Sequence, residues 1–451
     1  MSKIFASKVK NLSNPLVALL NQMAAHGAER FYAKRLAPND NSKNQVYLGG
    51  GFSALNIIPH GPIEDDVSNI AGSVRDRAKA SVRFFWLDEQ GLSPAPNAQL
   101  ILYPKYPEVR MSGFLLRAER APSELMRSRD EGRVLFLGIC EDGRVLGQVA
   151  PHYAPAAQTL GSINDLPSSG VFLNLDSIRL GADPKAVLLA ELRRIHEKGW
   201  IASQKLGVNG TPAPYTARNG GGYTLEAELG ISPNGYSEPD FMGWEVKQYA
   251  VGDFITFRAK GPVTLLTPEP TGGFYRDEGA EAFVRRFGYA DKSGKIGRLN
   301  FGGIYSTQHD FHKDTGLALK LQGFDIATGK ITDMDGAITL VDQNDTIAAT
   351  WGFKGIISHW NRKHAMAAYV PSIHRTAPVE YSYGNKVTLC EGTDVLLLLT
   401  ALSTGKIYYD PAIKLENMDS AKPALKRRSQ FRVKHSDLTS LYQTHATHSF
   451  E

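Results

Sequence analysis

Cysteine is scarce in this sequence, with two residues, Cys140 and Cys390, among 451. Their wide separation matches no metal-binding spacing and provides no disulfide framework, so we expect neither a zinc site nor a disulfide-stabilised secreted fold. Long apolar runs are also missing, because the longest, over 395–399, is far too short to cross a bilayer. The first residues lack the apolar core and cleavage site of a signal peptide. These absences predict a soluble, cytoplasmic protein without membrane contact.

A strong charge of one sign is absent as well. The 51 basic and 46 acidic residues leave a formal charge of +5. This small excess permits nucleic-acid binding but does not argue for it, because only a clustered charge would. The length of 451 residues exceeds what one ordinary hydrophobic core organises, so two domains are expected.

The pattern of apolar and turn residues changes along the chain. Apolar residues at helical spacing over 3–37 predict one or two amphipathic helices, and short β-type runs separated by turn residues follow. We therefore expect an α+β domain over 1–153 and a linker over 154–183, which is rich in small and turn residues. An α/β domain is expected over 184–443, beginning with a helix at 184–198. A flexible tail is expected over 444–451.

The residues that carry chemistry lie between Tyr223 and Tyr249. Glu226 lies in a short helical turn that Gly230 is expected to end. The run FMGWEVKQY (241–249) reads as a strand, in which Glu245 and Lys247 share a face because strand side chains alternate. Asp240 lies at the entrance of this strand or hairpin and can converge on the same face.

Such a grouping suits phosphodiester hydrolysis. Two carboxylates hold a hard divalent cation such as Mg²⁺, which polarises the scissile phosphate and lowers the pKa of a bound water. A lysine ammonium orients the attacking water and neutralises charge in the transition state. Acid-x-lysine alone is a weak signal, and the alternative reading of Glu245 and Lys247 is a solvated cross-strand ion pair.

A second acid-x-lysine sequence, Asp183-Pro184-Lys185 with Asp176 upstream, competes with this assignment. Pro184 would occupy the middle of a strand that needs a backbone N–H at that position. We therefore reject this rival.

Beyond these residues, the sequence resembles the MvaI/BcnI family of restriction endonucleases, within the PD-(D/E)xK nuclease superfamily. The resemblance covers most of residues 188–442 as several ordered blocks, whereas residues 1–170 have no counterpart that it explains. The blocks are GGYTLEAELGI (221–231), PDF (239–241), GWEVKQY (243–249), VTLLTPEPTGGFY (263–275), HWNRKHAMAAYV (359–370), EGTDVLLLLTAL (391–402) and KRRSQFRVK (426–434).

The resemblance implies a restriction-endonuclease-like mixed sheet flanked by helices. It also implies a deoxyribonuclease that uses Mg²⁺, with Mn²⁺ as a substitute, and that cuts double-stranded DNA as a monomer at a short site. The implied catalytic residues are Asp240, Glu245 and Lys247 with Glu226, and the implied metal ligands are Asp240, Glu245 and Glu226.

Candidate DNA contacts come from a basic segment over 421–434, from HWNRKHA (359–365) and from HDFH (309–312). Arginine and glutamine read base edges, whereas most contacts in such interfaces go to phosphates. The alternative for the basic segment is a solvated face, and the two histidines of HDFH lack further metal ligands nearby. The candidates are Lys426, Arg427, Arg428, Gln430, Arg432, Asn361, Arg362, Lys363, His364 and His309.

Three functions remain open. The first is a site-specific restriction enzyme in defence against foreign DNA. The second is an anti-phage effector nuclease of relaxed specificity, regulated by a protein partner or signal through residues 1–153. The third is an inactive DNA-binding protein that keeps the nuclease fold, which the competent residues at 240, 245 and 247 argue against.

Overall fold

The computed structural model describes residues 14–38, 45–66, 77–164, 166–207, 210–217, 219–231 and 240–451. The chain divides into two compact units. Unit 1 comprises Met1–Lys198, Asn234–Glu245 and Arg362–Met366, and unit 2 comprises Gly199–Pro233, Val246–Asn361 and Ala367–Glu451. The architecture is mixed α/β, as predicted for the C-terminal part, and none of the described helices is long and apolar enough to cross a membrane.

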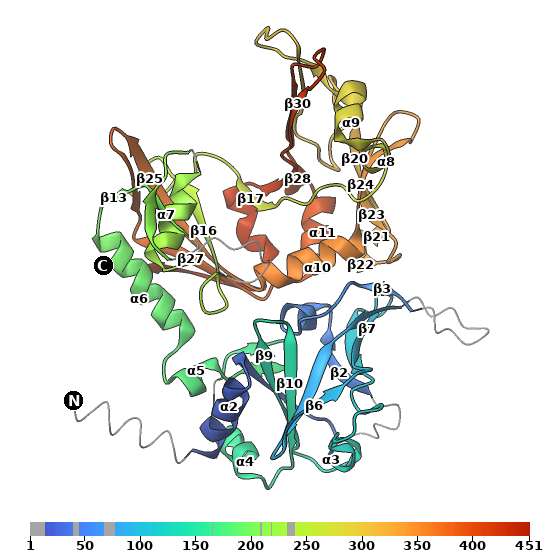
Figure 1. Cartoon of the computed structure of the whole chain (residues 1–451), viewed down its shortest axis with the longest axis vertical. Helices are drawn as coiled ribbons and strands as arrows, with labels where there is room; N and C mark the ends of the chain where they lie inside the picture. The colour runs from blue at the N-terminus through green and yellow to red at the C-terminus, as the bar shows by residue number, and fades with distance from the viewer. Residues whose placement is uncertain are drawn as a thin grey trace. The chain divides into compact units, whose positions relative to one another are not determined.

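Unit 1 is built on a seven-stranded sheet in the order β11-β12-β1-β9-β10-β5-β6, in which only β10 and β5 pair in parallel. Helices α2 (Pro15–Ala25) and α4 (Pro155–Gly161) lie side by side near this sheet (Figure 1) and contribute Leu20 and Leu160 to its core. The strands are β1 (Ala28–Arg35), β5 (Arg83–Asp88), β6 (Gly91–Ala95), β9 (Val134–Cys140), β10 (Arg144–Ala150), β11 (Ser168–Ser169) and β12 (Phe172–Asn174).

Two expectations for this unit differ from the structure. The helical pattern over 3–37 continues only to Ala25, where Gly27 at φ 98° lets the chain turn into strand β1; residues 1–13 lie outside the described residues. The expected linker over 154–183 is largely ordered structure. It forms α4, strands β11 and β12, and α5 (Asp176–Leu180), because β12 pairs with β1 and completes the sheet.

A second sheet of unit 1 has five strands in the order β2-β8-β7-β4-β3. Its side chains alternate, so that Ala78 and Ala80 are buried whereas Lys79 and Ser81 face outward. The strands are β2 (Gln45–Gly50), β3 (Glu64–Asp65), β4 (Ala78–Ser81), β7 (Gln99–Tyr103) and β8 (Glu108–Ser112), and two short helices accompany them, η1 (Ser53–Asn56) and α3 (Ser123–Arg127).

The C-terminal part begins with the predicted helix, α6 (Pro184–Glu197). Asp183 caps it, because its carboxylate accepts a hydrogen bond from the backbone N–H of Lys185 at 3.1 Å, and Pro184 occupies the first helical position, where it needs no donor.

The main sheet of unit 2 runs β13-β26-β25-β27-β32, and β16 also pairs with β25. Its strands are β13 (Ile201–Ala202), β16 (Glu245–Ala250), β25 (Met366–Thr376), β26 (Val379–Tyr383), β27 (Lys386–Glu391) and β32 (Thr444–Ser449). The last strand replaces the flexible tail expected over 444–451, because six residues of β32 pair in antiparallel register with β27. A polar composition, here THATHS, is compatible with an edge strand of this kind.

Smaller sheets complete unit 2. The long apolar run over 395–399 lies in α11 (Val395–Ser403), whose side chains are mostly buried and whose first turn Asp394 caps. The remaining strands are β14 (Gln204–Leu206), β15 (Pro212–Pro214), β17 (Val263–Leu266), β18 (Tyr289–Ala290), β19 (Arg298–Gly302), β20 (Ala318–Gln322), β21 (Phe324–Asp325), β22 (Lys330–Ile331), β23 (Ala337–Val341), β24 (Ile347–Gly352), β28 (Ile407–Tyr409), β29 (Ala412–Glu416), β30 (Ala424–Lys426) and β31 (Phe431–Val433). The remaining helices are α7 (Gly220–Glu228), α8 (Phe274–Asp277), α9 (Gly279–Phe287), α10 (Phe353–His364) and η2 (His435–Leu441).

Candidate active site and nucleic-acid interface

A tight two-residue turn leads into the strand with the candidate catalytic residues. The backbone groups of Phe241 and Trp244 exchange two hydrogen bonds, of 2.9 and 2.8 Å, around Met242 and Gly243. Both central residues have positive φ, 46° and 88°, as a type I′ turn requires. The chain therefore reverses direction between Asp240, immediately before the turn, and β16, immediately after it.

Strand β16 presents two chemically different faces. Glu245, Lys247 and Tyr249 alternate with Val246 and Gln248, and the printed contacts agree with this pattern. Tyr249 stacks on the ring of His435 at a centroid distance of 4.1 Å, whereas Gln248 Nε2 donates to Ser372 Oγ at 2.7 Å. Glu245 is only 3% exposed, and Lys247 is half-buried. Glu245 and Lys247 thus share a face, as the sequence pattern predicts.

Helix α7 packs over the Gln248 face of the sheet. A Cβ at Gly221 would approach Gln248 Cδ to 3.0 Å, and a Cβ at Gly220 would meet Ser203 Oγ at 2.6 Å. Gly220 and Gly221 therefore lie in the first turn of the helix, where close packing leaves no room for larger side chains. Gly230, at φ 76°, follows the helix end, and Ile231 donates its N–H to Glu226 O at 2.8 Å, which confirms the expected glycine ending.

The two glutamates of α7 both lie near Tyr383 of β26. Glu228 Oε1 accepts a hydrogen bond from Gln204 Nε2 at 3.0 Å. Burial raises the pKa of Tyr383 well above its usual range, and the carboxylates of Glu228 and Glu226 raise it further, so both lie near this tyrosine of β26. Tyr383 belongs to the Gln248 face, since its hydroxyl donates to Gly221 O at 2.7 Å. The case for Glu226 as a metal ligand therefore rests on the family pattern.

Within the part of the chain that the structure describes, no group of three or more His, Cys, Asp or Glu side chains is placed to hold a metal ion. The chemistry of the donors nevertheless suits a hard cation. A carboxylate as buried as that of Glu245 is stabilised by a nearby positive charge or by hydrogen bonds.

Sequence reasoning missed one residue that bears on this region, Arg30 of β1. Its Nε lies 2.6 Å from Asp176 Oδ2, and Asp176 also accepts the Phe31 N–H at 2.7 Å. A Cβ at Gly243 would approach Arg30 Nη1 to 1.9 Å, so the turn before β16 needs glycine for its contacts as well as for its φ. Arg30, Asp176 and Asp240 line the same hollow of about 470 Å³ in unit 1. No local sequence signal connects positions so far apart.

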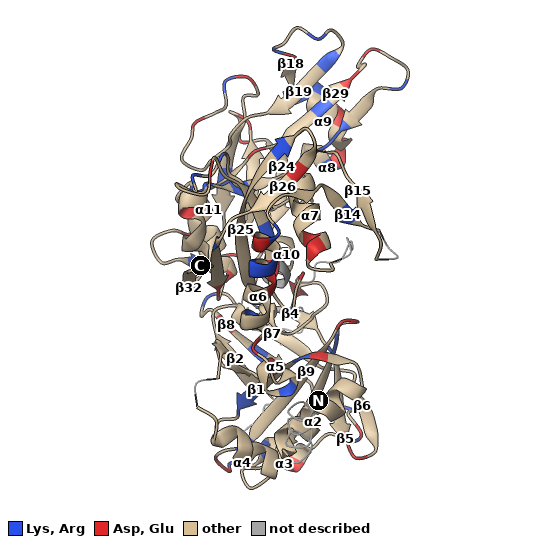
Figure 2. Cartoon of the chain, turned by 90° about the vertical axis from the view of Figure 1, so that its left-hand side faces the viewer, with Lys and Arg blue, Asp and Glu red and all other residues tan. Residues whose placement is uncertain are grey.

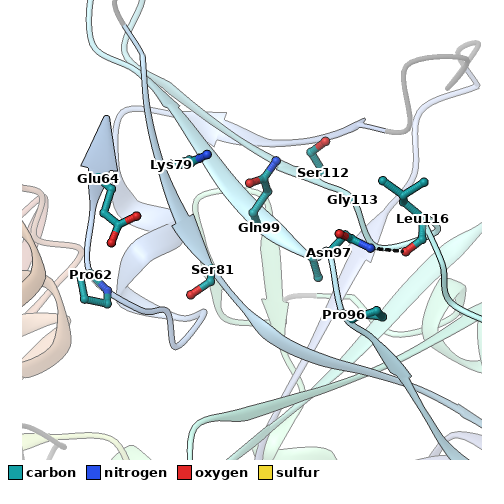
Figure 3. A pocket seen from close by; sticks show the side chains of 11 residues that line it. Pro62, Glu64, Lys79, Ser81, Pro96, Asn97, Gln99, Ser112, Gly113 and Leu116 are labelled. Atoms are coloured by element: carbon teal, nitrogen blue, oxygen red, sulfur yellow. Dashed lines mark hydrogen bonds between the residues drawn. The ribbon is translucent and has the colours of Figure 1, made fainter. Parts of the chain in front are cut away.

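A separate recess lies on the five-stranded sheet of unit 1 (Figure 3). It has a volume of about 490 Å³, and its lining includes Lys79, Gln99 and Ser112. Asn97 closes one end with a hydrogen bond from Nδ2 to Leu116 O at 3.0 Å. None of the candidate nuclease residues lines this recess.

The predicted basic segment over 421–434 divides into exposed and structural parts. Lys426, Arg427 and Arg428 are exposed. Gln430 is buried, and Arg432 pairs with Asp410 Oδ2 at 2.7 Å and donates to Pro262 O at 3.0 Å. The side chains of Gln430 and Arg432 therefore support the fold around β31, whereas Lys426, Arg427 and Arg428 are presented to solvent, as are Lys422 and Lys434 of the same segment.

The candidates on α10 and in HDFH are less accessible or less fully described. The side chains of Asn361, Arg362 and Lys363 lie outside the described residues, and that of His364 is only 1% exposed. His309 is exposed in a turn whose backbone N–H bonds to Ser306 O. Of these five candidates, His309 is the one that the structure shows on the surface.

Comparisons with known proteins identify a family for the C-terminal part. The model of the MvaI/BcnI restriction endonuclease family matches residues 189–442. Similar solved structures include restriction endonuclease MvaI in a complex with cognate DNA substrate and MvaI in the absence of DNA, with TM-scores of 0.43 and 0.33. Each is 18% identical and covers 59% of this chain and 98% of its own. No curated protein matches the chain.

Proposed function

The chain belongs to the MvaI/BcnI restriction endonuclease family and is a deoxyribonuclease, and we propose that it hydrolyses duplex DNA with a divalent cation at Asp240, Glu245 and Lys247. The observation that carries this proposal is the tight turn followed by β16. Asp240 immediately precedes this turn, and Glu245 and Lys247 share one face of the strand that follows it. All three residues lie inside the segment that matches the family.

Each side chain has a distinct task in the proposed reaction. The proposed metal is Mg²⁺, with Mn²⁺ as its substitute, and such a cation when bound would supply polarisation of the scissile phosphate and a more acidic water molecule. The carboxylates of Asp240 and Glu245 supply the hard oxygen donors for this ion. Lys247 holds the attacking water through its ammonium group and stabilises the charge that develops on the phosphoryl oxygens. Glu226 contributes through α7 if the ligand set follows the family pattern.

The proposed biological role is restriction of foreign DNA in the cytoplasm, by a monomer that cuts at specific sites. Lys426, Arg427 and Arg428 are the proposed phosphate contacts from the basic segment, because their side chains are exposed. The alternative is an anti-phage effector nuclease of relaxed specificity that the N-terminal domain, residues 1–153, regulates. It is favoured by the contact between Arg30 of β1 and Gly243 in the turn after Asp240.

Incubating the full chain with phage and plasmid DNA in Mg²⁺, followed by sequencing of the product ends, tests the function. Discrete ends support a site-specific restriction enzyme. Random ends, or cleavage only after a partner or signal is added, support the effector reading. A parallel reaction in EDTA tests the metal, and cleavage that persists without free divalent cations would exclude the proposed mechanism. No cleavage under any condition would leave the inactive DNA-binding reading.

A further inference from the structure

A short loop between β18 and β19 is built to hold one shape. We call residues 291–297 the β18–β19 tip. The Asp291 carboxylate accepts hydrogen bonds from Ser293 N at 2.9 Å and Asn300 Nδ2 at 2.8 Å, and it pairs with Arg298 at 2.5 Å. Bonds from the side chains of Ser293 and then Asn300 hold the pKa of Asp291 below its usual range, so this anchor stays charged.

The two glycines of the tip are needed for its backbone conformation and not to allow close packing. Gly294 and Gly297 have φ values of 81° and 71°, in the left-handed region. A Cβ at Gly294 would have no neighbour within 4 Å, and one at Gly297 would only reach Asn417 Cα at 4.0 Å. The tip is therefore an open structure whose conformation comes from turn residues and from Asp291.

This fixed loop exposes an apolar side chain between basic ones. Ile296 is 97% exposed, whereas the side chains of Lys292 and Lys295 are 62% and 53% exposed. The two lysines pair with Asp314 and Glu416, at 2.7 and 3.2 Å, but exposed pairs are weak and yield readily to a stronger anion. A single exposed isoleucine is ordinary, and it becomes informative only with its surroundings.

The surroundings are the polar face of the sheet β18-β19-β29-β30, a part of the chain in which basic and acidic residues both occur (Figure 2). One row across this face consists of Tyr289, Asn300, Lys414 and Lys426, which are successive register partners. Lys414 and Lys426 thus lie directly opposite each other, an arrangement that costs stability unless an acidic group offsets the repulsion, and Lys426 Nζ accordingly donates to Glu416 Oε2 at 2.9 Å. The other face is apolar and includes the buried residues Phe301, Ile413 and Leu415.

We propose that the β18–β19 tip and this basic sheet face bind duplex DNA, with Lys292 and Lys295 on phosphates and Ile296 in a groove. The inference rests on the proposed nuclease function, which brings DNA to unit 2. Charge complementarity selects the partner, because a duplex is a dense polyanion. A fixed apolar side chain flanked by cations suits a groove, where such residues contact sugars or wedge between base steps. Except for Lys426, none of the residues in this surface belongs to the basic segment over 421–434.

The experiment measures binding of the full chain to a short fluorescent duplex of mixed sequence, in EDTA, at several salt concentrations. The variants are Ile296→Ala and the double variant Lys292→Ala with Lys295→Ala. Lys320→Ala is the matched control, because Lys320 forms a similar exposed pair with Asp345 at 2.6 Å on another sheet of unit 2. Ile255→Ala is the control for an exposed isoleucine, since Ile255 is 87% exposed. Unfolding curves verify that each variant is folded.

The double variant should bind several-fold more weakly, and its plot of log affinity against log salt should lose about two units of slope. Ile296→Ala should weaken binding roughly fivefold with an unchanged slope, because an apolar contact releases no counterions. Both controls should bind like the wild-type chain. If the wild type cleaves and binds DNA but the tip variants match the controls, the tip proposal is overturned and the nuclease function stands. If the wild type neither binds nor cleaves DNA, both fail.

Discussion

Single residues distinguish the two acid-x-lysine sequences of this chain. Asp183 and Lys185 belong to the start of α6, where the Asp183 carboxylate accepts the Lys185 N–H, so neither is part of a strand. Glu245 and Lys247 lie in β16 on a common face. The sequence argument rejected the first pair because proline does not suit a central strand, and the structure agrees but shows a different cause, a capped helix beginning with proline.

Substitutions at the candidate active site should reduce DNA cleavage, whereas substitutions at Asp183 and Lys185 should leave cleavage unchanged. Asp240→Ala and Lys247→Ala should each reduce DNA cleavage at least about a hundredfold, because each removes a group that stabilises the transition state. Asp183→Ala should retain cleavage but lose about 1 kcal/mol of unfolding free energy through the lost cap. Lys185→Ala should change neither. Cleavage rates and denaturant unfolding curves check both effects, and full activity of Lys247→Ala would refute the site.

A pH dependence is expected at His435, which stacks on Tyr249 of β16. Burial lowers the pKa of this imidazole from its ordinary value of 6.5, so the folded chain holds it neutral. As the pH falls below about 6.5, the unfolded chain takes up a proton that the folded chain does not, and stability decreases.

His435→Phe keeps a ring on Tyr249 but removes the titration. The melting temperature of this variant should therefore fall less than that of the wild type between about pH 8 and about pH 5. The difference between the two curves isolates the histidine from all other titrating groups. Parallel curves over this range would show that His435 does not contribute.

At the scale of elements, the turn before β16 requires glycine at position 243 for two reasons, its backbone conformation and the space that Arg30 occupies. Gly243 has φ 88°, and a Cβ at this position would overlap the guanidinium of Arg30. Gly230 after α7 has a similar φ of 76°, but a Cβ there would meet nothing within 4 Å. Comparing substitutions at Gly230 and Gly243 therefore distinguishes the cost of backbone strain alone from the added cost of a steric clash.

Alanine at these two positions should have unequal effects. Gly230→Ala should cost about 1 kcal/mol of unfolding free energy through strain alone. Gly243→Ala should cost more, because the new Cβ also displaces Arg30 from its position near Asp176. It should also slow cleavage, since the turn sets the position of Asp240. Equal losses of stability, with unchanged cleavage by both variants, would contradict the packing argument.

At the scale of the whole molecule, the family match and the compact units do not coincide. The match covers residues 189–442, whereas residues 234–245 group with unit 1. Unit 1 has a core of its own and a polar recess that the family model does not cover. The role of the part of unit 1 that precedes the family segment can therefore be tested by removing residues 1–182.

A truncated chain that begins at Asp183 keeps the cap of α6 and the entire family segment. We expect it to retain metal-dependent cleavage, because the catalytic candidates all lie within 189–442. Its stability should be lower, since the turn at Met242 and Gly243 loses Arg30. Circular dichroism verifies folding, and end sequencing reports specificity. A folded but inactive truncated chain would mean that residues 1–182 are required for catalysis, and altered product ends would assign them a role in site selection.

Local features of this protein follow from its sequence alone. The start of α6 at Asp183 and Pro184, the end of α7 at Gly230 and the shared face of Glu245 and Lys247 depend on residues a few positions apart, so short patterns are sufficient to predict them. The ordered family blocks, confirmed over 189–442, identify the nuclease by the same kind of local evidence.

Only the tertiary structure decided which residues meet across long separations. The last residues form β32 because β27 provides an edge for pairing, and Arg432 supports the fold because Asp410 lies beside it. The row that ends in Lys414 and Lys426 exists because four strands align in one register. Each outcome depends on a partner that is remote in the chain, and hydrophobic patterns and charge counts do not specify which remote partner a residue finds.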